Sequence, residues 1–175
     1  KDALLDAMVD HVFTEVALPV EAPWREAIEA RCRSLRDTLN RHPWALPLLE
    51  SRRNPGPATL AHHDRLLGVL RGGGFTVAAA AHAVSFLDAY VLGFVQQEQS
   101  LPIQDPHVLD AMAAELMAAE LAQAYPHVAE LVAEHASQPG YSYGQEFEVG
   151  LPLMLDGLEA LRRHGARRRS SGTAR

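Results

Sequence analysis

Nine histidines are the side chains of this chain that most readily suggest chemistry, because imidazole binds metals and exchanges protons near neutral pH. None occurs in a His-Glu-x-x-His or Glu-x-x-His pattern, the spacings that bring metal ligands onto one helical face. His62 and His63 are adjacent and diverge on a helix. His82 lies in the most apolar segment, where a hydrogen-bonded core histidine is the favoured interpretation. Three others are expected at the surface: His107, His127 and His135.

Other catalytic patterns are also absent from the sequence. There is no Gly-x-Ser-x-Gly elbow, and Gly72-Gly73-Gly74 follows a predicted helix, not the strand that a phosphate-binding loop requires. The single cysteine, Cys32, excludes an internal disulfide and indicates a reducing cytoplasm, with a small apolar filler as its expected role. We therefore expect no enzyme, no metal and no cofactor. An enzyme that uses His82 or a histidine-bound metal is the less favoured alternative.

Composition favours one helical domain. Nearly half of the 175 residues are hydrophobic, only 6% are aromatic and alanine is abundant. We expect a domain over residues 1–165 and a basic, disordered, solubilising tail over 166–175. The tail holds four arginines and no acidic residue, so the body is more acidic than the net charge of −6. An acidic body repels phosphate backbones, so we do not expect it to bind nucleic acid itself. We also expect no signal peptide and no membrane span.

Helical periodicity, with proline and glycine at the breaks, predicts about seven helices and no strand. The fifth helix is expected to begin after a Thr76 cap and to be apolar nearly all round, which is typical of a central helix buried on all sides. Glycines after Arg71 are expected to end the fourth helix, and Gly165 the last. The expected ranges, with a further short piece near 126–135, are 2–17, 23–42, 43–50, 57–70, 76–99, 106–125 and 145–164.

The last predicted helix carries two apolar stripes. The first consists of Phe147, Gly150, Met154, Gly157 and Leu161. The second consists of Leu151, Leu155 and Leu158. One stripe can face the core of the chain, but nothing obvious in the chain covers the other, and a leucine left in water forfeits about 1.5–3 kcal/mol. We therefore predict a symmetric homodimer with the first stripe at its interface, while two internal stripes remain the alternative.

A helical body with an apolar central helix can hold a small molecule between its helices. The apolar candidates for lining such a pocket, which ordinary core packing also explains, are Phe13, Leu35, Leu66, Phe86 and Tyr90. The polar candidates are Arg31, Glu50, Asn54 and Gln97. For Arg31 and Glu50, exposure to solvent is the favoured interpretation.

Several short segments resemble, in order, the tetracycline-repressor-type (TetR) transcriptional regulators. Lys1-Asp2-Ala3-Leu4-Leu5-Asp6-Ala7 resembles the end of their DNA-binding domain, where it leads into the first helix of the core. The further matching segments are Trp24, Arg53-Asn54-Pro55, Gly74-Phe75-Thr76, Gly93 with Val95 to Glu98, Phe147, Gly150-Leu151 and Gly157-Leu158-Glu159. The resemblance covers about residues 1–164, and it places the nine pocket candidates in one region.

The resemblance implies an effector-binding and dimerisation core in which two helices of each protomer form a four-helix interface. It also implies an N-terminal helix-turn-helix head that precedes Lys1 and binds operator DNA, most commonly as a repressor. At the positions where the tetracycline repressor binds its drug–magnesium chelate, this chain lacks most of the required imidazoles and carboxylates; it has Ala17, Arg31, Glu50, Arg53, Ala89 and Gln97. We therefore expect a different, unknown effector, and an inward-facing Arg31 favours one with an anionic or carbonyl group. A stand-alone helical ligand-binding or dimerisation module is the alternative.

Overall fold

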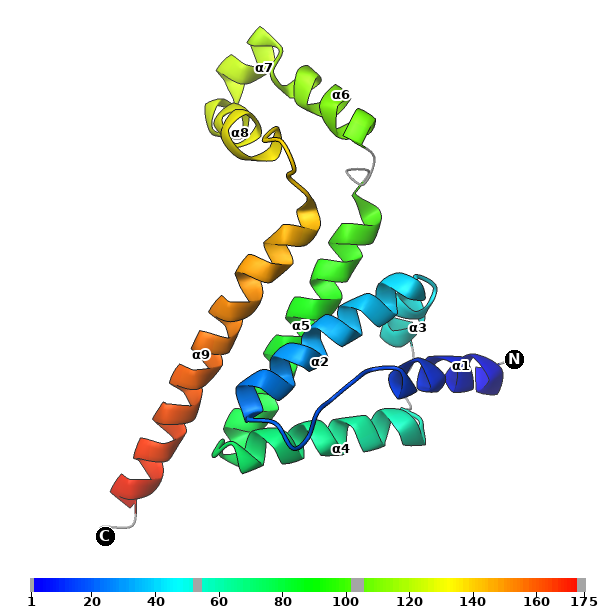
Figure 1. The fold of residues 1–175 in the computed structure, drawn as a ribbon, viewed down its shortest axis with the longest axis vertical. Helices are drawn as coiled ribbons and strands as arrows, with labels where there is room; N and C mark the ends of the chain where they lie inside the picture. Colours follow the sequence, from blue (N-terminus) through cyan, green and yellow to red (C-terminus); the bar gives the residue numbers. More distant parts are fainter. Residues whose placement is uncertain (1, 52–54, 102–105, 173–175) are drawn as a thin grey trace. The chain divides into compact units, whose positions relative to one another are not determined.

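A computed structural model of the chain describes residues 2–51, 55–101 and 106–172, and these residues form helices without a strand (Figure 1). This confirms the predicted all-α fold. The elements are α1 (Asp2–Thr14), α2 (Trp24–Arg41), α3 (Ala45–Ser51), α4 (Pro57–Gly72), α5 (Val77–Ser100), α6 (Pro106–Leu116), α7 (Ala119–Ala124), α8 (Pro126–Leu131), the π-helical segment η2 (Val132–Ala136) and α9 (Tyr143–Gly172).

Contacts divide the domain predicted over residues 1–165 into two compact units. The first unit contains the chain up to Gln96 and again from Leu151, so it holds α1 to α4, most of α5 and most of α9. The second contains residues 97–150. The boundary inside α9 lies next to Pro152, which cannot donate the usual helical hydrogen bond.

The core of the first unit forms where the apolar faces of its helices meet. Helix α1 packs on α3 and α4, and α2 packs on α4 (Figure 1). Each helix contributes residues at helical spacing, as the sequence pattern predicts. The largest fully buried side chains of this unit are Arg31, Phe75, Ile28, Leu35, Leu39, Leu66, Leu70, Leu87, Leu151, Leu155 and Leu158.

Helix α5 differs from the expectation of burial on all sides. One face is buried and consists of Ala79, Ala80, Ala83, Val84, Leu87, Val91 and Val95. The opposite face is exposed in the single chain and includes His82, Ser85 and Phe86, so His82 is a surface histidine and not a core one. By length and composition alone, the helix is long and apolar enough to cross a membrane. Because its Val84, Leu87 and Val91 pack into the helical core, we interpret α5 as a core helix.

The corner between α4 and α5 is tight and places both helices against α2. Gly74 has φ +92°, a left-handed conformation that glycine adopts without strain. At Gly73 an added Cβ would lie 2.7 Å from Cβ of Trp24, so this position requires a close backbone approach. The Trp24 ring meets the buried Phe75 ring edge-on at 5.0 Å. The backbone N–H of Ala79 donates to Thr76 Oγ1 at 3.1 Å, which confirms the predicted cap of α5.

The second unit contains few buried side chains among its described residues. Val132 and Phe147 are buried, and His135 Nε2 lies 2.6 Å from Glu146 Oε1. The His135 ring also contacts the Tyr141 ring at 5.0 Å, and the Tyr143 hydroxyl donates to Gln97 Oε1. These contacts join η2 and the end of α5 to the start of α9 within this unit.

Candidate functional site

A buried arginine forms the centre of the most unusual polar cluster in the first unit. Arg31 projects from α2, and its side chain is 1% exposed. Its Nη2 donates to Asp88 Oδ1 on α5 at 2.7 Å, and its Nε donates to His62 Nε2 on α4 at 3.4 Å. Three helices thus contribute one group each. The expectation that Arg31 is exposed to solvent is therefore wrong: the Asp88 carboxylate compensates its charge, which makes burial tolerable.

His62 is neutral in this cluster. Burial lowers the pKa of His62 from its ordinary 6.5 to about 4, and the positive charge of Arg31 lowers it as well. Since the Nε2 atom accepts a hydrogen bond from Arg31, the proton of the neutral ring belongs on Nδ1. The described residues offer no hydrogen-bond partner to His62 Nδ1 or to Arg31 Nη1, although both atoms are buried. Such atoms lose their water without compensation, so the cluster has unused capacity to bind an acceptor.

Buried apolar side chains lie on the helices that contribute the cluster. The Phe13 ring of α1 contacts the His62 ring at 5.6 Å between centroids, and Leu35 and Leu66 are buried on α2 and α4. Cys32 is buried beside Arg31, and burial raises the pKa of its thiol to about 11. The thiol therefore stays protonated at neutral pH and is a poor nucleophile, in keeping with its expected role as a filler.

The structure brings together four of the predicted pocket residues and separates others. Phe13, Arg31, Leu35 and Leu66 are all buried in the first unit. Phe86 does not join them, because it lies on the exposed face of α5. Gln97 is exposed and belongs to the second unit, and Tyr90 is half-buried with its ring 6.2 Å from that of Phe94. Two candidates cannot be placed: Asn54 and the side chain of Glu50 lie outside the described part of the chain.

His62 and Asp88 are the two polar residues of the cluster that the sequence analysis did not select. Helical spacing could have found both. His62 precedes the buried Leu66 and Leu70 at intervals of four residues, which places it on the buried face of α4. Asp88 lies between Val84 and Val91 at intervals of four and three residues, within the buried stripe of α5.

A second feature is an open apolar groove of about 540 Å³ between α5 and α9 in the first unit. Two large apolar side chains on it are exposed, Phe86 to 53% and Leu153 to 67%. The groove is lined by Phe86, Leu153, Met154, Gly157, Leu158, Ala160, Leu161 and His164.

Only some residues of the predicted dimer stripe line the groove. Met154, Gly157 and Leu161 line it, and a Cβ added at Gly157 would meet nothing within 4 Å. Gly150 is half-buried and does not line it. Phe147 differs from the prediction, because its side chain is fully buried within the single chain and is not available to a partner. The second stripe, Leu151, Leu155 and Leu158, is buried in the core.

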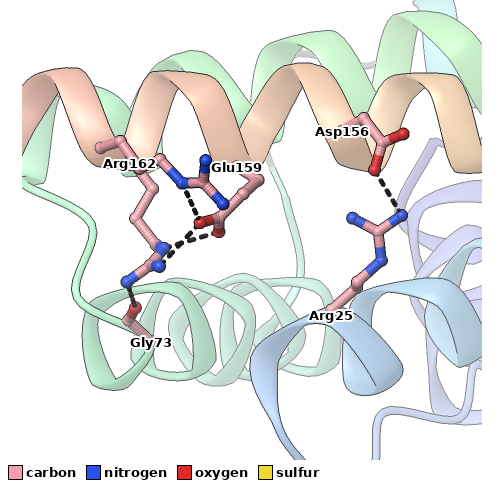
Figure 2. Close-up of polar contacts among 6 residues, drawn as sticks. Arg25, Gly73, Asp156, Glu159 and Arg162 are labelled. Atoms are coloured by element: carbon pink, nitrogen blue, oxygen red, sulfur yellow. Dashed lines mark hydrogen bonds and ion pairs between the residues drawn. The ribbon is translucent and has the colours of Figure 1, made fainter.

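Polar contacts fix the opposite side of α9 to the rest of the first unit (Figure 2). Arg25 Nη2 of α2 pairs with Asp156 Oδ1 at 2.7 Å. Arg162 Nη1 reaches the Gly73 carbonyl at 3.4 Å, while its Nε and Nη2 donate to Glu159. These hydrogen bonds hold the pKa of Glu159 well below its ordinary value. They place α9 so that its apolar groove side faces outward.

The side chain of Asp10 connects α1 to the first turn of α4. Its carboxylate accepts hydrogen bonds from the backbone N–H groups of Ala58 at 3.1 Å and Thr59 at 2.7 Å, and from the Thr59 hydroxyl at 2.9 Å. Desolvation raises the pKa of Asp10, but these three bonds outweigh it and leave the pKa below its ordinary value. An added Cβ at Gly56 would lie 2.3 Å from Asp10 Cγ, so only glycine leaves room for this cap.

Across residues 2–51, 55–101 and 106–172, no three His, Cys, Asp or Glu side chains lie close enough to hold a metal ion. His82, on which the alternative of an enzyme depends, is exposed.

These features define the class of the chain: a helical core with a buried, incompletely satisfied polar cluster and an outward-facing apolar groove on a helix pair. Residues 18–162 match the family model of the tetracyclin repressor-like, C-terminal domain. The chain belongs to this family, which consists of TetR-type transcriptional regulators.

Two similar proteins are HTH-type transcriptional regulators. The chain is 33% identical over 162 residues to an HTH-type transcriptional regulator of Saccharopolyspora erythraea, covering 91% of this chain and 66% of that protein. It is 30% identical over 171 residues to the HTH-type transcriptional repressor DrrR1 of Streptomyces coeruleorubidus, covering 92% of this chain and 62% of that protein. The chain thus spans a little less than two thirds of the length of these relatives.

Solved structures agree with the fold. Apo ActR from Streptomyces coelicolor superposes with a TM-score of 0.74 at 27% identity, over 93% of this chain and 77% of that chain. ActR in complex with actinorhodin gives the same TM-score at 28% identity, over 91% of this chain and 76% of that chain. ActR has also been solved in complex with (S)-DNPA, with a TM-score of 0.73 at 27% identity over 91% and 76% of the two chains.

Proposed function

We propose that this chain is the effector-binding and dimerisation core of a cytoplasmic transcriptional repressor, whose operator is bound by an N-terminal helix-turn-helix head. The observation that carries the sensing role is the buried Arg31–His62–Asp88 cluster with its two unpaired N–H donors. Membership of the TetR family and the ligand complexes of ActR support it. The core acts as a regulator and not as an enzyme.

Dimerisation uses the α5–α9 groove. A second copy related by a two-fold axis would cover Phe86 and Leu153, which otherwise remain in water. Two helices from each protomer then form a four-helix interface. Of the predicted stripe, we retain Gly150, Met154, Gly157 and Leu161 as interface residues and omit the buried Phe147.

Signal transfer follows from the position of α4. His62 lies on this helix within the polar cluster, and Asp10 of α1 caps its first turn. A ligand that binds Arg31 and His62 better in one arrangement of α4 than in another shifts the population towards that arrangement. The cap carries the change to α1, the helix nearest to the proposed DNA-binding head.

The negative net charge of the chain indicates that the proposed head, and not this chain, contacts DNA. The net charge is −6 even with the basic C-terminal residues included, so the body repels DNA at ordinary salt. We propose that residues 166–175 form a solubilising basic extension beyond the sensing core.

The test uses the whole protein, including any residues that precede Lys1. Duplexes selected from a random pool identify the bound sequence, and fluorescence anisotropy then measures release of that duplex by small molecules. Actinorhodin and (S)-DNPA, which ActR binds, are the first two probes. We expect sequence-specific binding that a ligand weakens. A whole protein that binds a probe and no DNA would contradict the proposal and support a stand-alone ligand-binding module.

A further inference from the structure

The unpaired atoms of the polar cluster specify the chemistry of what binds there. Arg31 Nη1 and the protonated Nδ1 of His62 are both donors, and both are buried without an acceptor among the described residues. Their side chains are joined through the Arg31 Nε–His62 Nε2 contact, so the two donors belong to one cluster. A complementary group must therefore accept hydrogen bonds, and a second donor such as an amine would be repelled by the guanidinium.

The charge of the cluster specifies the acceptor further. The Arg31 guanidinium is already paired with Asp88 at 2.7 Å, and His62 is neutral, so the cluster carries no net charge. A carboxylate placed against Arg31 would be a second anion close to Asp88 in a poorly hydrated site, which is costly. An uncharged oxygen, as in a ketone or quinone, accepts from both donors without that cost.

The surroundings of the cluster specify the remainder of the ligand and the side from which it approaches. The Phe13 ring contacts the His62 ring, and the buried Leu35 and Leu66 follow Arg31 and His62 by four residues on α2 and α4; these side chains favour an apolar or aromatic body. The Asp88 and His63 side chains are 26% and 41% exposed, so the cluster reaches the surface at this edge.

We propose that Arg31 Nη1 and His62 Nδ1 together bind the uncharged carbonyl oxygen of an apolar, aromatic ligand. The proposal rests on the effector-sensing role proposed above and names the ligand class of that site. This binding role can be distinguished from a purely structural one, because it requires the two donors to discriminate between ligands of equal shape.

The experiment uses three naphthalene probes that differ in one group: 2-acetylnaphthalene, 2-ethylnaphthalene and 2-naphthoate. Calorimetry or ligand-observed NMR measures their binding to the whole protein and to the double variant Arg31→Met/His62→Phe. The matched control is His63→Phe, which changes the neighbouring histidine, whose Nε2 lies 3.9 Å from Asp88 and contributes neither donor. Nitrogen-15 NMR of His62 reports its tautomer and the environment of Nδ1 in the free and bound protein.

We expect the wild-type protein and His63→Phe to bind 2-acetylnaphthalene about 10- to 100-fold more tightly than 2-ethylnaphthalene, the range for hydrogen bonds that include a charged donor. 2-Naphthoate should bind more weakly than the ketone, and the His62 Nδ1 signal should shift only with the ketone. In the double variant the preference should disappear. Its melting temperature should fall, because Arg31→Met also removes the partner of the Asp88 carboxylate, so the binding of the probes is compared at a temperature where the variant is folded.

Four results would overturn the inference: equal binding of ketone and hydrocarbon, a preference that survives in the double variant, tighter binding of the naphthoate, or no binding of any probe at millimolar concentration. A crystal structure in which one water bridges both donors and remains there with the ketone bound would also overturn it. Operator release is measured separately, so a protein that prefers the ketone but never releases DNA contradicts the proposed function and leaves this inference intact.

Discussion

The α5–α9 groove allows a quantitative test of dimerisation through Leu153. Its side chain is 67% exposed in the single chain, projects from α9 and lines the groove. In the proposed dimer a second copy covers this exposed part. The substitution Leu153→Ser removes the apolar surface without a bulky replacement, so the dimer should weaken while the fold of each protomer is preserved.

The magnitude follows from the exposed fraction and the symmetry. Fully burying a leucine contributes about 1.5–3 kcal/mol, so covering two thirds of it contributes about 1–2 kcal/mol. A two-fold axis repeats the residue, which brings the loss to about 2–4 kcal/mol per dimer. Since about 1.4 kcal/mol corresponds to a factor of ten, the dissociation constant of the dimer should rise about 30- to 1,000-fold.

Sedimentation velocity over a dilution series measures this constant. Leu60→Ser is the matched control, because Leu60 is also an exposed leucine on a helix, 56% exposed on α4, but does not line the groove. It should leave the dissociation constant unchanged. The reasoning is refuted if Leu153→Ser and Leu60→Ser dissociate alike, or if the unmodified protein is a monomer at micromolar concentration.

Three further predictions concern the stability of the first unit. The pKa of His62 is about 4 in the folded chain against an ordinary 6.5, so the unfolded chain binds more protons between these values. Stability should therefore fall on the order of 3 kcal/mol as the pH is lowered from 6.5 to 4, and urea titrations of His62→Phe should show a flatter dependence. Asp10→Ala should lower the free energy of unfolding by about 1 kcal/mol, because α4 loses its cap. Gly56→Ala displaces the same carboxylate, so its destabilising effect should be much smaller in the Asp10→Ala background than alone. Gly74→Ala should lower the melting temperature through a cost of about 1–2 kcal/mol, because φ is +92° there; an unchanged melting temperature would contradict the strain argument.

Helix positions could be predicted from the sequence wherever proline or a capping residue marks an end. Helix α2 begins at Trp24 after Pro23 and ends at Arg41 before His42-Pro43, as expected. The end of α9 could not be predicted in this way. Gly165 was expected to terminate it, but the helix continues to Gly172. A Cβ at Gly165 would lie 3.1 Å from Thr76 Cγ2, so this glycine permits close packing against the start of α5 instead of ending a helix.

The candidate site could be predicted only in part, because burial of charge depends on partners from other helices. Arg31 alone is a poor candidate for the interior, and only Asp88 and His62, 57 and 31 residues away, make its burial tolerable. Conversely, Phe86 is apolar and was assigned to the interior. It lies on the other side of α5, where hydrophobicity indicates a partner and not a pocket. The polarity of Arg31 and Phe86 is known from the sequence. Whether each side chain faces the core or the surface depends on how the helices pack.

Helix α4 is where the separate features of the first unit meet. Its first turn is capped by Asp10 of α1, its middle carries His62 of the polar cluster, and Gly73 at the corner after it accepts a hydrogen bond from Arg162 of α9. A rigid helix of 16 residues that is fixed at both ends cannot change position in the middle without stressing one of those contacts. A ligand at His62 therefore acts on the end of α4 next to α1 or on the end that contacts α9 through Arg162. Because the Asp10 cap has three hydrogen bonds of 3.1 Å or less and the Arg162 contact is a single one of 3.4 Å, we expect α4 to keep α1 with it and to move relative to α9.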